Sequence, residues 1–251
     1  VVLEILDGAG SVVRRVEEST AARGVHRIVW DLRHEAPIGA DGQPSRRLPG
    51  RFVLPGSYQV RLTVAEQVQV RPLQVRMDPG LSVADGARRA LDAALALQAD
   101  LVGAVALFGS AVDTVLAQAG TVLESLAGLP DAPGTLTERA RELEAGARRL
   151  RVVLEGPGQG GIAQQETVLP LSTLVTRLYS TTEGWTHRPT ADQSRLTTRA
   201  HRDLVELLSR LRPLLERDLP ELRRAMAEAG IPWPAGDAPV LPAGLLPPFA
   251  P

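Results

Sequence analysis

The hydrophobic residues of this chain change their spacing at one place, and this change constrains the fold more than any other feature. Before residue 78, apolar and polar residues alternate, as in Tyr58–Val64, and a period of two is typical of a β-strand with one buried face. After the pair Asp78-Pro79, apolar residues recur at steps of three and four, which is typical of a helix in a bundle or coiled coil. The sequence therefore predicts two parts, with the boundary between Asp78 and Ser82.

The first part, residues 1–78, is predicted to be an antiparallel β-sandwich. Val1–Leu6 and Val25–Leu32 have the composition of strands, and each is followed by turn residues. A Pro-Gly pair predicts a tight turn before the most regular strand. The alternation changes parity at Pro72, so we expect a bulge or a strand break there. About five strands with no helix between them are typical of a sandwich.

The second part, residues 79–231, is predicted to be an antiparallel up-down bundle of about four helices. We expect the first helix over residues 83–127, with Gly103, Gly109 and Gly120 as candidate points of interruption. Further helices are expected over residues 135–154, over 164–182, from Thr190 onward, and over 219–229. Three pairs have the spacing of a capping box: Ser82 with Asp85, Thr135 with Glu138, and Thr190 with Gln193.

Prolines mark three further positions in the helical part. Pro170 falls in the early turns of the third helix, where a missing amide has the smallest effect, and Pro213 should kink the fourth. The final segment, residues 232–251, is rich in proline. We expect this tail to be extended, and either mobile or packed along the bundle surface.

The composition excludes several classes of function. Without cysteine, the chain has no disulfide, no zinc site built on thiolates and no thiol nucleophile. All 28 basic residues are arginine and the net charge is −1, so we expect no nucleic-acid partner. The longest nearly apolar stretch, Leu101–Val112, is too short for a membrane span. The chain begins directly in a strand-like run, so we expect a fragment of a larger protein.

No catalytic motif is recognised. The segment Gly156–Gly161 matches the dinucleotide fingerprint G-x-G-x-x-G, but helical residues precede it and no parallel strand follows, so we interpret it as a loop between helices. No two of the four histidines have the spacing of a helical metal pair, and no G-x-S-x-G elbow occurs. We therefore predict no catalytic residue, no metal and no cofactor. Trp30, His34 and Trp185 are the candidate ligand or interface contacts.

Two β segments carry a resemblance to a known family. Gly24–Arg33 and Leu54–Val64, with Val1–Gly10 upstream, resemble the Ig-like module of the flagellar hook-capping type. Together with the helical part, they resemble the C-terminal region of secreted bacterial propeller proteins with sortilin-like and sialidase-like BNR repeats, often labelled glycosyl hydrolases. The helical matches are Leu174–Tyr179, Pro189-Thr190 and Asp218–Leu222.

The resemblance implies an Ig-like sandwich and an extracellular or periplasmic location, and it assigns any enzymatic activity to a propeller outside this chain. We therefore expect a non-catalytic structural or interaction region whose partner is an upstream β-propeller or another protein chain. The alternative is an accessory domain that binds polysaccharide or peptide for a propeller-type glycosyl hydrolase or peptidase. Accessory binding requires a concave patch that gathers Trp30, His34 or Trp185 with carboxylates, whereas an interaction module predicts a broad apolar face.

Overall fold

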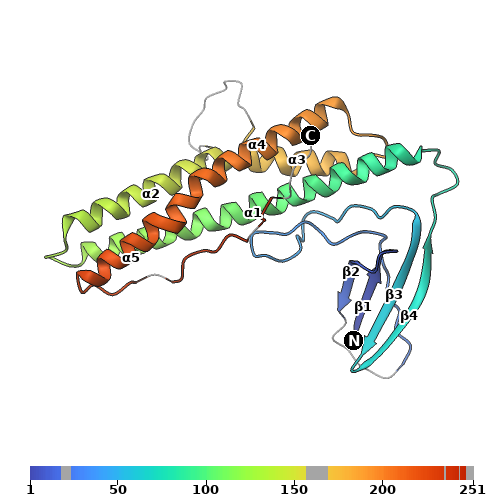
Figure 1. Ribbon diagram of the computed structural model, residues 1–251, viewed down its shortest axis with the longest axis horizontal. Coiled ribbons are helices and arrows are strands. Elements are labelled where there is room, and N and C mark those ends of the chain that lie inside the picture. The colour runs from blue at the N-terminus through green and yellow to red at the C-terminus, as the bar shows by residue number, and fades with distance from the viewer. Residues whose placement is uncertain (18–23, 157–168, 235, 243, 247–251) are drawn as a thin grey trace. The chain divides into compact units, whose positions relative to one another are not determined.

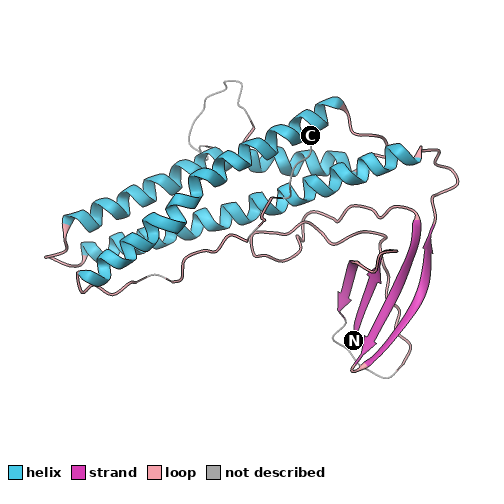
Figure 2. Cartoon of the chain, in the orientation of Figure 1, coloured by secondary structure: helices cyan, strands magenta, loops and turns pink. Residues whose placement is uncertain are grey.

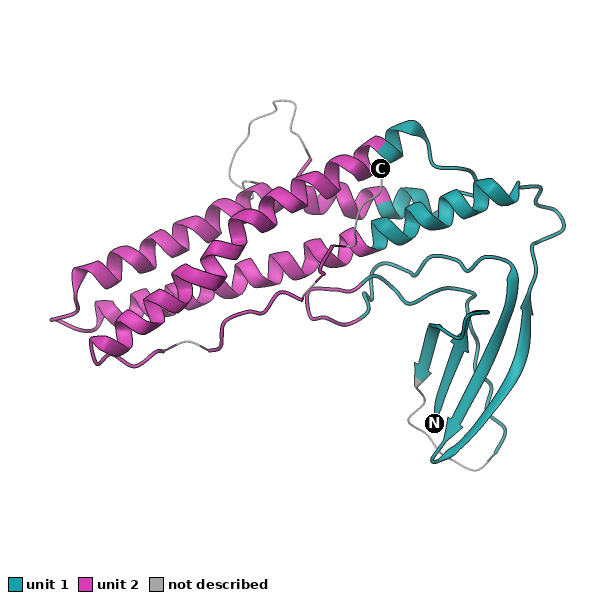
Figure 3. Cartoon of the chain, viewed as in Figure 1, with its two compact units in different colours: residues 1–37, 44–99, 179–194 teal, residues 38–43, 100–178, 195–251 magenta. Residues whose placement is uncertain are grey.

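The computed structural model describes residues 1–17, 24–156, 169–234, 236–242 and 244–246. It has a mixed β + α fold, as predicted: strands occur up to Val75 and helices from Asp85 (Figure 2). The chain divides into two compact units (Figure 3). Unit 1 comprises residues 1–37, 44–99 and 179–194, and unit 2 comprises residues 38–43, 100–178 and 195–251.

Unit 1 contains a four-stranded antiparallel sheet with the order β2-β1-β3-β4 (Figure 1). Its strands are β1 (Val2–Leu6), β2 (Val12–Glu17), β3 (Gly56–Val64) and β4 (Gln67–Val75). The pairing of β1 with β2 shifts between Ile5 and Leu6, and Val13 is the extra residue at this bulge. A bulge re-aims a side chain, and here Val13 is buried in the sheet's core with Ile5, Val53, Tyr58 and Val75.

The predicted strand Val25–Leu32 is wrong, because these residues pair with no other strand in the described part of the chain. Val25 is fully exposed and Val29 is 77% exposed, so their apolar side chains find no face to cover. At Leu32 the backbone has φ +60°, which a β-strand does not tolerate. Pairing resumes at an isolated bridge between Arg33 and Phe52.

The predicted bulge or break at Pro72 is also wrong. β3 and β4 keep one continuous register, in which Tyr58 faces Leu73 and Gln59 faces Pro72. β4 is an edge strand, so a residue without an N–H group can occupy it without losing a ladder bond. The apolar–polar alternation of the sequence changes at Pro72 for another reason. Val70 lies on the face of the sheet opposite to Leu73, and it is an apolar residue that is 42% exposed.

The helices are α1 (Asp85–Ala127), α2 (Gly134–Glu155), α3 (Leu171–Glu183), α4 (Ala191–Pro213) and α5 (Leu219–Glu228). α1 runs for 43 residues without interruption, so none of its glycines breaks it. Two of them instead allow close packing: a Cβ at Gly103 would lie 3.5 Å from Ile38 Cβ, and one at Gly109 would lie 3.2 Å from Leu154. The small cost of a glycine in a helix is outweighed by burial of the neighbouring apolar stripe.

α1 is also long and apolar enough, by length and composition, to cross a membrane. Its most apolar 18-residue window has a mean hydropathy of 1.7, and 56% of that window is buried in the structure. A core helix of this length passes the same test, so the helix is weak grounds for a membrane span. In unit 2 its fully buried residues include Phe108, Val112 and Val115.

One of the three predicted capping boxes is confirmed. The Thr190 hydroxyl accepts a hydrogen bond from the Gln193 amide at 3.1 Å, and the Gln193 side chain accepts one from the Thr190 amide at 2.8 Å. α2 begins at Gly134 with no side-chain cap, which contradicts the box at Thr135. At the start of α1, Asp85 forms an ion pair with Arg88.

The other helix boundaries follow the prolines and glycines. α3 begins at Leu171, directly after Pro170, while residues 164–168 of the predicted third helix lie outside the described residues. A π-helical turn over Leu214–Asp218 follows Pro213 and joins α4 to α5, so the proline changes the hydrogen-bond pattern without ending the helix. After α5, Gly230 has φ +72°, and the Ile231 amide reaches the Met226 carbonyl in a Schellman motif.

Candidate functional site

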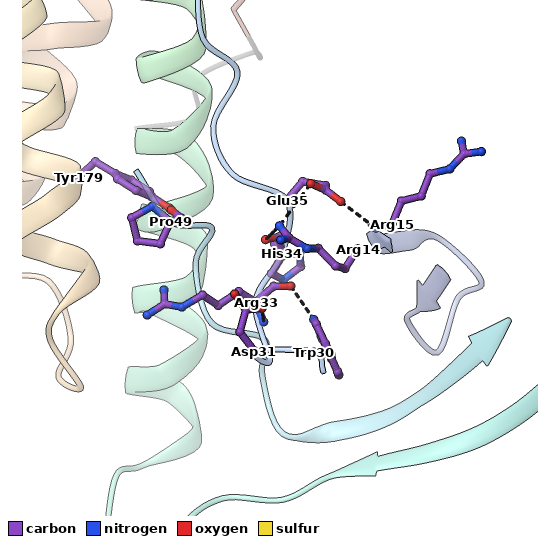
Figure 4. A network of polar contacts seen from close by, with 9 residues as sticks. All are labelled: Arg14, Arg15, Trp30, Asp31, Arg33, His34, Glu35, Pro49 and Tyr179. Atoms are coloured by element: carbon purple, nitrogen blue, oxygen red, sulfur yellow. Dashed lines mark hydrogen bonds and ion pairs between the residues drawn. The ribbon is translucent and has the colours of Figure 1, made fainter. Parts of the chain in front are cut away.

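The three side chains singled out in the sequence all belong to unit 1, but they have different surroundings. Trp30 is partly buried against the sheet's core. Its ring meets Tyr58 edge to face, with 5.9 Å between centroids, and its indole Nε1 donates to the Arg33 carbonyl at 2.9 Å (Figure 4). The apolar body and the polar tip of Trp30 are both engaged, so it is a core residue.

His34 lies in the polar network drawn in Figure 4. Its amide donates to the Arg51 carbonyl at 2.9 Å, and its carbonyl accepts from Arg14 at 3.4 Å. Burial lowers the pKa of the imidazole below its usual 6.5, and the positive charge of Arg51 adds to the lowering. His34 is therefore neutral at pH 7.

Trp185 follows α3 and is 49% exposed. It lines a cavity of about 370 Å³ whose residues all belong to unit 1, hereafter the unit 1 cavity. Trp30 and His34 do not line it. Of the three predicted contacts, Trp185 is therefore the one that lines the unit 1 cavity.

The unit 1 cavity is mainly apolar. Its wall is formed by the segment before β3, the end of β4, the first turns of α1 and the residues after α3. Phe52 and Leu81 are 53% and 46% exposed, so large apolar surfaces gather around one hollow with Trp185. Its apolar residues are Leu32, Phe52, Val53, Leu54, Pro55, Val75, Met77, Leu81, Leu91, Leu95 and Trp185.

Arg33 holds two residues of the cavity wall, Phe52 and Glu183, in place. Its guanidinium pairs with the Glu183 carboxylate, donates to the Gly50 carbonyl at 2.6 Å, and lies 3.6 Å from the centroid of the Phe52 ring. The Arg33 and Glu183 side chains are only 17% and 15% exposed. Charge pairing, hydrogen bonding and cation–π contact therefore act on one partly desolvated group.

Two further contacts join Pro49 and Arg51, the neighbours of Gly50, to helices. Arg51 Nε donates to Asp92 of α1 at 2.7 Å, and the Tyr179 hydroxyl of α3 donates to the Pro49 carbonyl at 2.7 Å (Figure 4). Burial raises the pKa of Tyr179 to about 12, and the Glu183 carboxylate adds to the shift. We call these three contacts, Arg33–Glu183, Arg51–Asp92 and Tyr179–Pro49, the clasp.

The clasp needs a glycine beside it. A side chain at Gly50 would collide with the backbone carbonyl of His34, so residues 33–35 and 49–51 approach as closely as bare backbones allow. The hydrogen bond from the His34 amide to the Arg51 carbonyl is 2.9 Å long and depends on this approach.

Two of the charged residues that line the unit 1 cavity are paired within the clasp. Asp92 and Glu183 each form an ion pair with an arginine, so their charges are balanced at the wall, whereas Arg76, Asp78 and Arg88 line the cavity outside the clasp. Among the described residues, no group of three histidine, aspartate or glutamate side chains is placed to hold a metal. Gly156 is described, but the rest of the Gly156–Gly161 motif lies outside the described residues.

The charged residues of the clasp had no signal in the sequence. Arg51 and Asp92 are 41 positions apart, and Arg33 and Glu183 are 150 apart, so no local spacing connects them. In a chain with 28 arginines, the sequence does not distinguish these charged residues from the many others that would be expected at the surface.

Comparisons with known proteins found no counterpart: no protein-family model, no curated protein sequence and no solved structure matches this chain.

Proposed function

We propose that this chain is a non-catalytic structural and interaction region from the C-terminal end of a larger secreted propeller protein. Its partner in this proposal is an upstream β-propeller or another protein chain. The observation that carries the proposal is the clasp, because two of the carboxylates that line the unit 1 cavity, Asp92 and Glu183, are used to hold Arg51 and Arg33 against helices. A catalytic carboxylate needs a free approach to substrate, and Asp92 and Glu183 each have an arginine in that place.

The β part, in this proposal, is a reduced Ig-like module. One face of its four-stranded sheet is covered by Trp30 and Val53, which come from the irregular segment between β2 and β3. This segment takes the place of the second layer of a sandwich. The helices, in turn, are proposed to form an antiparallel up-down bundle, supported by the buried apolar stripes of α2 and α4.

The proposal is tested by deleting residues 1–251 from the parent protein. Substrate turnover per folded molecule should be unchanged, while thermal stability or assembly of the parent should fall. If turnover is lost and stability and assembly stay intact, the structural role is refuted. The secreted location is tested by locating the parent protein in fractionated cells and medium; a cytoplasmic location contradicts it.

A second function is favoured by the unit 1 cavity: an accessory site that binds polysaccharide or peptide. The cavity gathers exposed Phe52 and Trp185 beside the carboxylates of Asp92 and Glu183. Aromatic faces stack on sugar rings or apolar peptide side chains, and polar groups at the wall set orientation.

The two functions are separated by a binding measurement on the 251-residue chain. The heat of binding is measured by isothermal titration calorimetry while short oligosaccharides or peptides are titrated in. Saturable binding that is lost in Trp185→Ala and Phe52→Ala, and retained in Val29→Ala, supports the accessory site. Val29 is a matched control because it is an exposed apolar residue of unit 1 outside the cavity. Absence of saturable binding refutes the accessory site.

A further inference from the structure

A hollow in unit 1, separate from the unit 1 cavity, is lined with arginine. Its volume is about 420 Å³, and its wall is formed by two residues of β2, by part of the segment 31–36 and by the segment 44–50. All of its residues belong to unit 1, and none of them lines the unit 1 cavity. We call it the arginine hollow. Its charged residues are Arg14, Arg15, Arg46, Arg47, Asp31 and Glu35.

The two carboxylates of the arginine hollow are bonded to the chain itself. Glu35 accepts a hydrogen bond from the Arg15 amide at 2.7 Å (Figure 4), and its other carboxylate oxygen pairs with Arg14 at 3.4 Å. Asp31 Oδ1 accepts a hydrogen bond from the Arg33 amide at 3.2 Å. Two carboxylates balance at most two of the four arginines, so the wall carries an excess of two positive charges.

Arg46 and Arg47 supply this excess. Both are exposed, and their guanidinium groups have no hydrogen-bond or ion-pair partner in the described part of the chain. Their backbone, however, is fixed. The Ser45 amide donates to the Pro37 carbonyl at 2.8 Å, and the Ser45 hydroxyl accepts from the Arg47 and Leu48 amides, both at 3.2 Å. The turn therefore uses its amides internally and leaves its two guanidinium groups for another partner.

The clasp fixes the other end of this turn. The Pro49 carbonyl accepts a hydrogen bond from the Tyr179 hydroxyl at 2.7 Å, and the Arg51 side chain pairs with α1. Between them, Gly50 lies against the backbone of residue 34. Because the backbone already holds both arginines at one hollow, an anion that binds there meets two cations without having to order the loop.

The chemistry of the arginine hollow suits a phosphate monoester. The guanidinium group donates two parallel hydrogen bonds to phosphate oxygens, and two excess positive charges match the charge of a phosphate monoester, which is close to −2 at pH 7. A volume of about 420 Å³ is typical of a small-molecule site, so it has room for the group that carries the phosphate. In the described part of the chain, Asp31 Oδ2 accepts no hydrogen bond, and a ligand hydroxyl can donate to it.

We propose that the arginine hollow binds a small phosphate monoester that also carries hydroxyl groups, such as a sugar phosphate. Arg46 and Arg47 bind the phosphate, and Asp31 accepts a hydrogen bond from a hydroxyl. Because such a ligand binds only the folded unit, it should also raise the melting temperature. The inference does not rest on the function proposed above, since the hollow shares no residue with the unit 1 cavity.

The test is isothermal titration calorimetry on the 251-residue chain at pH 7.5, with glucose 6-phosphate as the probe. Glucose 6-phosphate should bind saturably, and glucose, which lacks the anion, should not bind. Glucose 6-sulfate carries one negative charge where the phosphate carries two, so it should bind about tenfold more weakly. Methyl phosphate has the same charge without the hydroxyls and should also bind more weakly. The proposal is overturned if glucose 6-phosphate does not bind, or if any of the other three probes binds as tightly.

Arginine variants separate recognition in the hollow from general attraction by charge. Arg46→Gln and Arg47→Gln together should weaken binding of glucose 6-phosphate about a hundredfold, since each removes a hydrogen bond to a charged group. Arg71→Gln is the matched control, because Arg71 is an exposed residue of β4, at the opposite edge of the sheet from β2, and it should leave binding unchanged.

Arg47→Lys keeps the charge without the planar fork, so it should weaken binding less than Arg47→Gln but measurably. All of these side chains are exposed, so the melting temperature of the free chain should stay the same. If the double variant binds like the wild type, or if Arg71→Gln weakens binding as much as the double variant does, the assignment of the site is wrong.

Discussion

The internal contacts that stabilise unit 1 differ in kind from those that stabilise unit 2. The core of unit 2 consists of apolar stripes on helices, with Ala200, Leu204 and Leu211 fully buried on α4 alone. Unit 1 has a small apolar core under its sheet and relies in addition on the clasp, whose contacts are two ion pairs and one hydrogen bond from a hydroxyl to a backbone carbonyl. The difference shows that a short β part reaches a defined structure with directional polar contacts where it lacks apolar area.

The largest expected effect is in the core of unit 2. Leu204→Ala removes a fully buried side chain from α4 and should lower the free energy of unfolding by about 3 kcal/mol. The adjacent Val205 is 46% exposed, so Val205→Ala should change it by less than about 0.5 kcal/mol. Both are measured by urea unfolding followed by circular dichroism. Equal effects of the two changes would contradict the placement of the apolar core.

The clasp should have the next largest effect. Glu183→Gln removes the charge that balances Arg33, and both side chains are mostly buried; the free energy of unfolding should fall by about 2 kcal/mol. In a double-mutant cycle with Arg33→Gln, the two changes should be less than additive. Additive effects would mean that the two residues do not interact, and the proposal for unit 1 would lose its main support.

Tyr179 tests the clasp through its pH dependence. The hydroxyl donates to the Pro49 carbonyl, so Tyr179→Phe should cost about 1 kcal/mol at pH 7. In the folded chain the pKa of Tyr179 is raised from 10.0 to about 12. Between these values the unfolded chain loses the proton and the folded chain keeps it, so this part of the stability is complete below pH 10 and declines as pH rises toward 12.

Thermal unfolding of the wild type and of Tyr179→Phe at pH 8 to 12 measures this contribution. Tyr58 also has a raised pKa, but it is present in both chains, so the difference between their curves isolates Tyr179. A constant difference across this range would contradict the buried hydrogen bond.

The sequence predicted those parts of the molecule that depend on periodicity. The helices from Asp85 onward and the strand over Tyr58–Val64 follow repeated apolar spacing, which reports burial on one face. The strand predicted at Val25–Leu32 failed because Val25 and Val29 have no partner strand to cover them and are exposed, and composition does not show whether a partner strand exists. Pro72 misled the prediction because an edge position is a property of the sheet order.

The candidate site was less predictable than the fold. Trp185, Trp30 and His34 were all predicted as ligand or interface contacts; Trp185 lines the unit 1 cavity, whereas Trp30 packs against the core and His34 lies in the polar network. The clasp was missed because its partners come together only after α1 and α3 have packed. Pairing of charges across 41 and 150 positions is a consequence of the tertiary structure and leaves no periodic trace.

The smallest expected effect sharpens the comparison between buried and exposed charge pairs. Glu206 and Arg210 of α4 form an ion pair one helical turn apart, with side chains 61% and 59% exposed. Water and salt screen such a pair, so Glu206→Gln should lower the free energy of unfolding by about 0.3 kcal/mol, and by less at high salt. The same Glu-to-Gln change at Glu183 should have an effect several times larger and less sensitive to salt. If the two changes have equal effects, burial does not distinguish the clasp from an ordinary surface pair.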